Sequence, residues 1–158
     1  MKKLALLFAG LSLFVATGCN NNDETVLEAP LVGVWQPVKK VVTVVATGQV
    51  PVSDGISFDT TCQKTSRWTF ASGNAGKRTD MGDSATPGTC TPTFDRTFTY
   101  TYDKDSKAIQ IKYQGIVQPD QGKIISISDT ALNIMFEDKT DPTKFHSETY
   151  TLDRKSVV

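Results

Sequence analysis

Residues 97–102 read Thr-Phe-Thr-Tyr-Thr-Tyr, and this alternation decides the fold class. Successive side chains of a β-strand point to opposite faces, so the aromatic rings share one face and the threonines share the other. The stretch therefore predicts a half-buried strand. The same period of two recurs on both sides of it, at Trp68 and Phe70, Ile109 and Tyr113, Ile125 and Ile127, Leu132 and Phe136, and Tyr150 and Leu152.

Short polar segments separate these strands. Residues 103–106, 121–122, 129–130 and 138–143 carry the Asp, Gly, Ser and Pro residues that favour turns. Loops this short cannot cross over between parallel strands, so we expect an antiparallel meander. No segment carries a helical stripe of ten residues or more. The sequence thus predicts an all-β domain of about eight strands.

Two segments depart from the alternation. Val41, Val42, Val44 and Val45 form a run of β-branched residues, which predicts a strand that is buried on both faces or bent. Residues 71–93 are rich in glycine, proline and small polar residues, which predicts a long loop or short irregular strands around a cysteine.

The N-terminus predicts export and lipidation. Lys2 and Lys3 precede an apolar run that ends at the small residues before Cys19, which is typical of a lipoprotein signal peptide over residues 1–18. Cys19 would then be acylated, and residues 19–30 would form a flexible tether. Acyl chains would make the membrane a partner, and we expect a bacterial outer membrane lipoprotein that is periplasmic or surface-exposed. The alternative is cleavage by an ordinary signal peptidase near the same position.

Length, charge and cysteine content limit the number of domains and the kinds of partner. Without residues 1–18, 140 residues remain of the 158, enough for one domain over residues 31–158. They carry 15 basic and 17 acidic side chains, which argues against a nucleic-acid partner. We expect Cys62 and Cys90 to form a disulfide. The alternatives are two buried thiols or a metal pair, and metal is the weaker because His146 is the only histidine.

No catalytic constellation, cofactor motif or metal motif is found in the sequence, and we expect no enzyme. His146 shares a strand face with Glu148, but a lone strand histidine facing water is the plainer interpretation. The aromatic residues predict a wall for a small apolar ligand, with packed core as the alternative. The candidates for this wall are Phe98, Tyr100, Tyr102 and Tyr113.

The order of landmarks resembles the lipocalin-like domains of bacterial lipoproteins. Gly33-Val34-Trp35 opens the domain, one cysteine precedes Trp68-Thr69-Phe70, and a second cysteine follows. The resemblance implies an up-and-down β-barrel whose closed end is plugged by Trp35, with Arg154 stacked on it. The alternative for Arg154 is an exposed charge at a strand end.

The resemblance also implies a function. We expect an envelope-anchored barrel that binds a small apolar or amphipathic ligand. The alternative is a non-enzymatic protein or glycan interaction module with a solid core at the cell surface.

If Cys19 carries the acyl chains, the mature protein should fractionate with membranes and require detergent for extraction. Two or three acyl chains hold a protein that a single chain would release. Cys19→Ser should move the protein to the soluble fraction on immunoblots of fractionated cells. Soluble wild-type protein would contradict the lipoprotein prediction.

Overall fold

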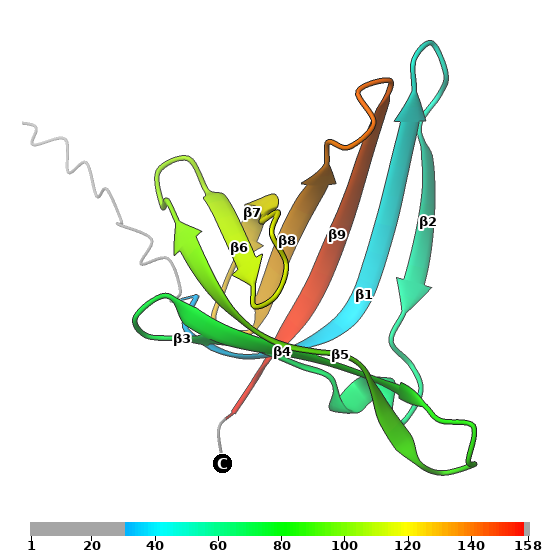
Figure 1. Cartoon of the computed structure of the whole chain (residues 1–158), viewed down its shortest axis with the longest axis vertical. Helices are drawn as coiled ribbons and strands as arrows, with labels where there is room; N and C mark the ends of the chain where they lie inside the picture. Colours follow the sequence, from blue (N-terminus) through cyan, green and yellow to red (C-terminus); the bar gives the residue numbers. More distant parts are fainter. Residues whose placement is uncertain (1–30, 157–158) are drawn as a thin grey trace, which may run out of the picture.

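The computed structural model describes residues 31–156, which form nine strands and one short 3₁₀ helix (Figure 1). The elements are β1 (Gly33–Ala46), β2 (Val52–Ser57), η1 (Gln63–Thr65), β3 (Arg67–Ala71), β4 (Ala75–Asp83), β5 (Cys90–Tyr102), β6 (Ala108–Tyr113), β7 (Asp120–Ile127), β8 (Ala131–Asp138) and β9 (Lys144–Lys155). The predicted signal peptide, Cys19 and the tether over residues 19–30 lie outside the described residues. Between residues 31 and 156, no helix is long and apolar enough to cross a membrane.

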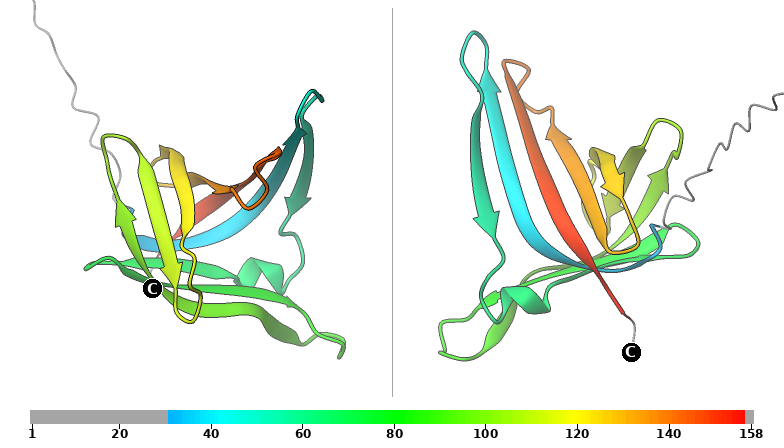
Figure 2. Two further views of the ribbon diagram at one scale, coloured as in Figure 1. Left: turned by 45° about the horizontal axis from the view of Figure 1, so that its top comes forward. Right: turned by 180° about the vertical axis from the view of Figure 1, so that it is seen from behind.

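The strands close into an antiparallel barrel. From β3 to β9 each strand pairs with the next, and β9 pairs with one edge of β1 (Figure 2). The other edge of β1 pairs first with β3 and farther along with β2. Because β2 and β3 occupy the same position around the barrel, the nine strands fill eight positions. The expected all-β, up-and-down barrel of about eight strands is confirmed.

The valine run of β1 lies in a long, bent strand. The register against β9 shifts between Pro37 and Lys39, and the strand leaves β3 and joins β2 at this irregularity. Its valines at positions 41, 42, 44 and 45 are half-buried. The bent-strand alternative is therefore confirmed, and burial on both faces is wrong.

Of the two alternatives predicted for residues 71–93, the long loop is wrong, because β4 and the start of β5 occupy most of this segment, with an irregularity in their register between Asp80 and Met81. Gly76 lies inside β4, directly across from Phe98 of β5. A Cβ atom at Gly76 would lie 2.3 Å from two ring atoms of Phe98, so the ring occupies the space above the glycine. The glycine thus makes room for the ring inside a strand, whereas the composition of the segment suggested a loop.

The turn predicted at residues 121–122 is wrong for the same reason. Both residues lie in β7, and Gly122 faces Phe136 of β8. A Cβ at Gly122 would lie 2.7 Å from a ring carbon of Phe136. The chain turns earlier, between β6 and β7, where Gly115 has a φ of 79°. The other three predicted turns join β5 to β6, β7 to β8 and β8 to β9, and are confirmed.

The prediction that Ile125 of β7 points inward is also wrong. The register between β7 and β8 shifts between Ile124 and Ser126. A bulge of this kind moves the side chains that follow it to the other face. Ile124 is consequently buried at 1% exposure, whereas Ile125, expected inside, is 54% exposed. Ile127 packs against the core, as expected.

A disulfide joins Cys62 to Cys90, as expected. Cys62 precedes η1 in the connection between β2 and β3, and Cys90 begins β5. The bond therefore fastens this connection to the β4–β5 hairpin, whose tip projects past Arg67 at the start of β3 (Figure 1).

Gly76→Ala should destabilise the barrel by about 1–3 kcal/mol, because the added methyl group would overlap the Phe98 ring and the Thr69 carbonyl oxygen. Gly55→Ala is the matched control. Its methyl group would meet only the flexible end of Lys39, at 3.4 Å, so little change in stability is expected. Urea unfolding monitored by circular dichroism measures both variants. Equal stability of the two would contradict the packing role of Gly76.

Candidate functional site

Trp35 and Arg154 close one end of the barrel. The Trp35 side chain is fully buried, and its Nε1 donates to the Leu31 carbonyl at 3.0 Å. The Arg154 guanidinium carbon lies 4.3 Å from the Trp35 ring centroid, and Nη1 donates to the Val32 carbonyl at 3.1 Å. A Cβ at Gly33 would lie 2.6 Å from this Nη1, so the glycine leaves room for the arginine. Arg154 thus stacks on Trp35 as the resemblance implies, and their role as a plug stays a prediction.

The aromatic residues expected to line a ligand pocket pack against one another. The Phe98 ring lies 5.3 Å from Phe70 and 5.6 Å from Tyr113, measured between centroids. Tyr100 lies 5.2 Å from Phe70 and donates its hydroxyl hydrogen to the Ala71 carbonyl. Phe98, Tyr100 and Tyr113 are buried, and Tyr102 packs at the edge of the core. Their contacts build the barrel wall, and their role toward a ligand stays a prediction.

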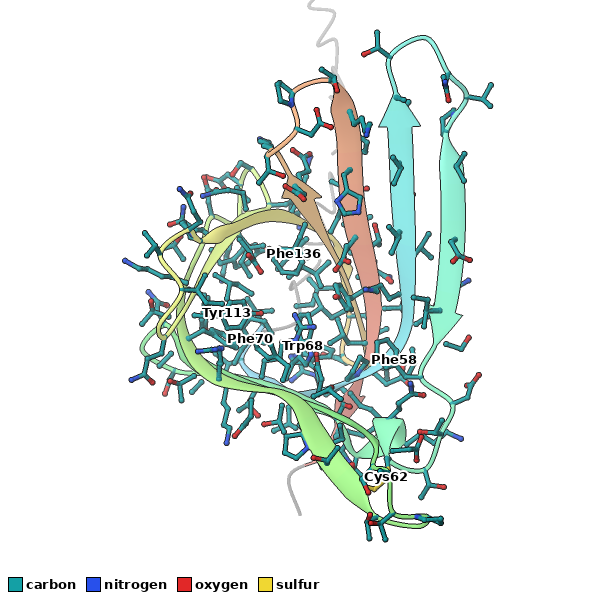
Figure 3. The ribbon with its side chains drawn as sticks, turned by 45° about the vertical axis from the view of Figure 1, so that its right-hand side comes forward. Phe58, Cys62, Trp68, Phe70, Tyr113 and Phe136 are labelled. Atoms are coloured by element: carbon teal, nitrogen blue, oxygen red, sulfur yellow. A yellow bond between two sulfur atoms is a disulfide. The ribbon has the colours of Figure 1, made fainter. Side chains whose placement is uncertain are left out.

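A charged group that the sequence analysis missed lies inside the barrel. Arg78 projects inward from β4 and forms an ion pair with Asp80, with Nε at 2.8 Å and Nη2 at 2.6 Å from Oδ2. Both side chains are 15% exposed. The surrounding rings point into the barrel, as the labelled Trp68 and Tyr113 do in Figure 3. We call this group the central cluster; its members are Trp68, Arg78, Asp80, Phe94, Tyr113 and Tyr150.

Aromatic faces and hydroxyls hold the guanidinium of the central cluster. The Arg78 guanidinium carbon lies 4.1 Å from the Trp68 centroid, 4.9 Å from Phe94 and 5.3 Å from Tyr150. Its Nη1 and Nη2 each lie 3.4 Å from a hydroxyl, of Tyr113 and Tyr150 respectively. Burial alone would lower the pKa of Arg78, but the bonds to Asp80 raise it above its usual value. Arg78 is therefore charged at every physiological pH.

A cavity opens at the end of the barrel opposite Trp35. Its volume is about 620 Å³, and we call it the mouth cavity. The start of β7 lies beside the end of β8 here, because Gln121 pairs with Glu137. The lining residues are Gln118, Pro119, Asp120, Gln121, Phe136, Glu137, Asp138, Lys139, Thr140, His146 and Glu148. Phe136 gives the cavity an aromatic surface among mostly polar groups.

Two carboxylates of the mouth cavity have opposite pKa shifts. Burial would raise the pKa of Glu148, but hydrogen bonds from Tyr150 at 2.7 Å and Lys40 at 3.0 Å lower it below its usual value. Asp120 is exposed as a residue, but partial burial of its carboxyl group raises its pKa; Arg78 opposes this effect, and the charge of Glu148 adds to it. Glu148 is thus held as an anion by the fold, whereas the fold disfavours the charge on Asp120.

His146 lines the mouth cavity beside Glu148, on the strand face that the sequence predicts for both. Its Nδ1 lies 3.4 Å from Oδ2 of Asp138. No group of three or more His, Cys, Asp or Glu side chains within residues 31–156 is arranged to hold a metal ion. The lining groups can accept hydrogen bonds from a ligand and pack an apolar group against Phe136.

Comparison with known families agrees with the fold. A family model described as a lipocalin-like domain matches residues 31–134. The chain belongs to this family. Comparison with the curated proteins found no match.

Three solved structures illustrate the similarity in fold. Apocrustacyanin C1 is 12% identical, with a TM-score of 0.46 and coverage of 80% of this chain and 62% of that chain. Lobster apocrustacyanin A1 is 11% identical, with a TM-score of 0.44 and coverage of 80% and 62%. A triple mutant of bovine odorant binding protein is 15% identical, with a TM-score of 0.40 and coverage of 80% and 74%. This chain therefore spans less than two thirds of the length of the two crustacyanins.

Asp120→Asn should raise the melting temperature at pH 7. A carboxyl group whose pKa is raised in the folded state opposes folding once it is ionised, so its removal is favourable above that pKa. Well below the unfolded-state pKa, near pH 3, the carboxyl is neutral in both states, and the variant should match wild type. Differential scanning calorimetry at the two pH values measures this difference. A lower melting temperature at pH 7 would show that Asp120 stabilises the fold as an anion.

Proposed function

We propose that this protein is a non-enzymatic, lipocalin-like binding protein that takes a small amphipathic ligand at the open end of its barrel. The mouth cavity is the observation that carries this function. Its volume of about 620 Å³ falls in the range of small-molecule sites. Family membership supports the same function, because a closed barrel can hold a ligand at its mouth.

The lining supports an amphipathic ligand over a purely apolar one. Phe136 offers an aromatic surface, and its ring lies 6.3 Å from that of Tyr150. Asp120 and Glu148 offer carboxylate oxygens, and Gln118 offers an amide. A ligand with an apolar body and hydrogen-bond donors, such as hydroxyl or ammonium groups, would satisfy both kinds of surface.

Two carboxylates of the cavity, those of Glu148 and Asp138, are better suited to binding than to general-base catalysis. Glu148 accepts bonds from Lys40 and Tyr150, which hold its pKa low. Asp138 accepts the Thr140 backbone N–H and contacts His146. A general base needs a pKa close to the working pH, and these bonds keep both carboxyl groups ionised far below neutrality.

We further propose that acyl chains on Cys19 anchor the barrel at the bacterial outer membrane, facing either the periplasm or the surface. The support is the lipoprotein-type sequence of residues 1–19. The polar tether over residues 19–30 would keep the mouth cavity clear of the lipid.

One observation favours the alternative, an interaction module for a protein or a glycan. A groove of about 570 Å³ lies between the β1–β2 and β8–β9 hairpins, with Val45 and Phe145 in its lining. Phe145 is 45% exposed. A partner could cover this ring, while the barrel interior held no ligand.

A neutral, environment-sensitive dye such as N-phenyl-1-naphthylamine distinguishes the two functions. The wild-type protein should bind the dye with increased fluorescence if the mouth cavity takes amphipathic molecules. Gln118→Trp places a large ring in the cavity lining and should weaken binding at least tenfold. Fluorescence titration measures the affinity.

Lys104→Trp is the matched control, because Lys104 lies in the exposed turn between β5 and β6, outside the cavity lining. It should bind the dye as wild type does. Absence of dye binding to wild type would favour the interaction module. Equal binding by Gln118→Trp would place the ligand elsewhere.

A further inference from the structure

The guanidinium of Arg78 blocks the interior of the barrel. Arg78 starts from β4, and its guanidinium reaches the ring of Tyr150 on β9, a strand that does not pair with β4. It also stacks on Trp68 of β3 and Phe94 of β5. A single side chain thus contacts rings on three other strands.

Bonds within the central cluster fix this side chain. Asp80 accepts from two nitrogens of Arg78 through Oδ2, and its Oδ1 accepts the Trp68 Nε1 hydrogen at 2.9 Å. The carboxylate is therefore held by both the arginine and the ring beneath it. Swinging Arg78 aside would leave a buried carboxylate without its partner, which is costly in a low-dielectric interior. The block is a permanent part of the folded barrel.

The central cluster lies directly below the mouth cavity. Phe136, in the cavity lining, has its ring 6.4 Å from Trp68 and 6.3 Å from Tyr150. Glu148, also in the lining, accepts the Tyr150 hydroxyl hydrogen. A ligand that enters from the mouth meets these groups first. Fully buried side chains fill the barrel around and below them, among them Trp35, Phe70, Leu132 and Leu152.

We propose that Arg78 sets the depth of the ligand pocket, so that the barrel takes short ligands and excludes long acyl chains. This inference rests on the proposed function. It gives Arg78 a role in ligand selectivity, and it defines the ligand class by the length of the apolar chain. The Arg78 guanidinium covers the face of the Trp68 ring, so removal of Arg78 would open space over that ring.

A series of 1-alkanols from butanol to dodecanol tests this depth. Each methylene that is buried in a pocket raises affinity about fourfold. For wild type, calorimetric titration should show this gain for the short alkanols and then a plateau once the chain reaches the central cluster. Arg78→Ala combined with Asp80→Asn should move the plateau to longer chains by several methylenes. The second substitution removes the carboxylate that would otherwise lose its partner.

Arg78→Met combined with Asp80→Asn is the matched control. Methionine fills the interior without charge, so its plateau should fall where the wild-type plateau falls. The Arg78 role is overturned if wild-type affinity rises through dodecanol, or if the folded Ala/Asn variant keeps the wild-type plateau. Should the Ala/Asn variant fail to fold, the wild-type profile alone supports or overturns the proposal. Binding of no alkanol by any of these proteins would overturn the proposed function as well.

Discussion

The ion pair of Arg78 and Asp80 constrains the whole barrel. Two charges taken out of water cost several kcal/mol each, and only closely fitted partners offset this cost. Here the group spans four strands, because Trp68, Tyr113 and Tyr150 join the pair on β4 from β3, β6 and β9. A shift of one residue in any of these strands would turn its partner to the outer face. The pair therefore selects one register for the closed barrel.

The fold could be predicted where the alternation of apolar and polar residues along one strand shows which side chains are buried. Trp68 and Phe70 alternate with polar residues, and both are buried. The prediction failed at Gly76 and Gly122, because the reason for each glycine is a ring on another strand. Phe98 and Phe136 lie 22 and 14 residues farther along the chain from these glycines. Local composition carries no sign of such a partner, and a glycine inside a strand therefore looks like a turn.

The candidate site could be predicted only in part. The period of two placed His146 and Glu148 on one face of β9, and both line the mouth cavity. It could not connect them to Asp120, which reaches the cavity from the start of β7. The central cluster was hidden for a different reason. Arg78 and Asp80 alternate with Lys77 and Thr79, so all four residues are polar and the strand has no hydrophobic pattern to identify its inner face.

Arginine–tryptophan stacking occurs at two levels of the barrel, and one row of residues connects them. Arg154, Trp35, Trp68 and Arg78 lie directly across from one another on β9, β1, β3 and β4. Each arginine lies over its neighbouring tryptophan, at 4.3 Å and 4.1 Å from the ring centroid. Such contacts contribute about 0.5–2 kcal/mol each, and more when water is excluded.

Arg154 shields its ring from solvent at the closed end, whereas Arg78 covers its ring inside the barrel. With both tryptophans covered, the largest apolar surfaces of the interior are already occupied. The proposed ligand would then find its contacts above this row, at Phe136 and the polar groups of the mouth.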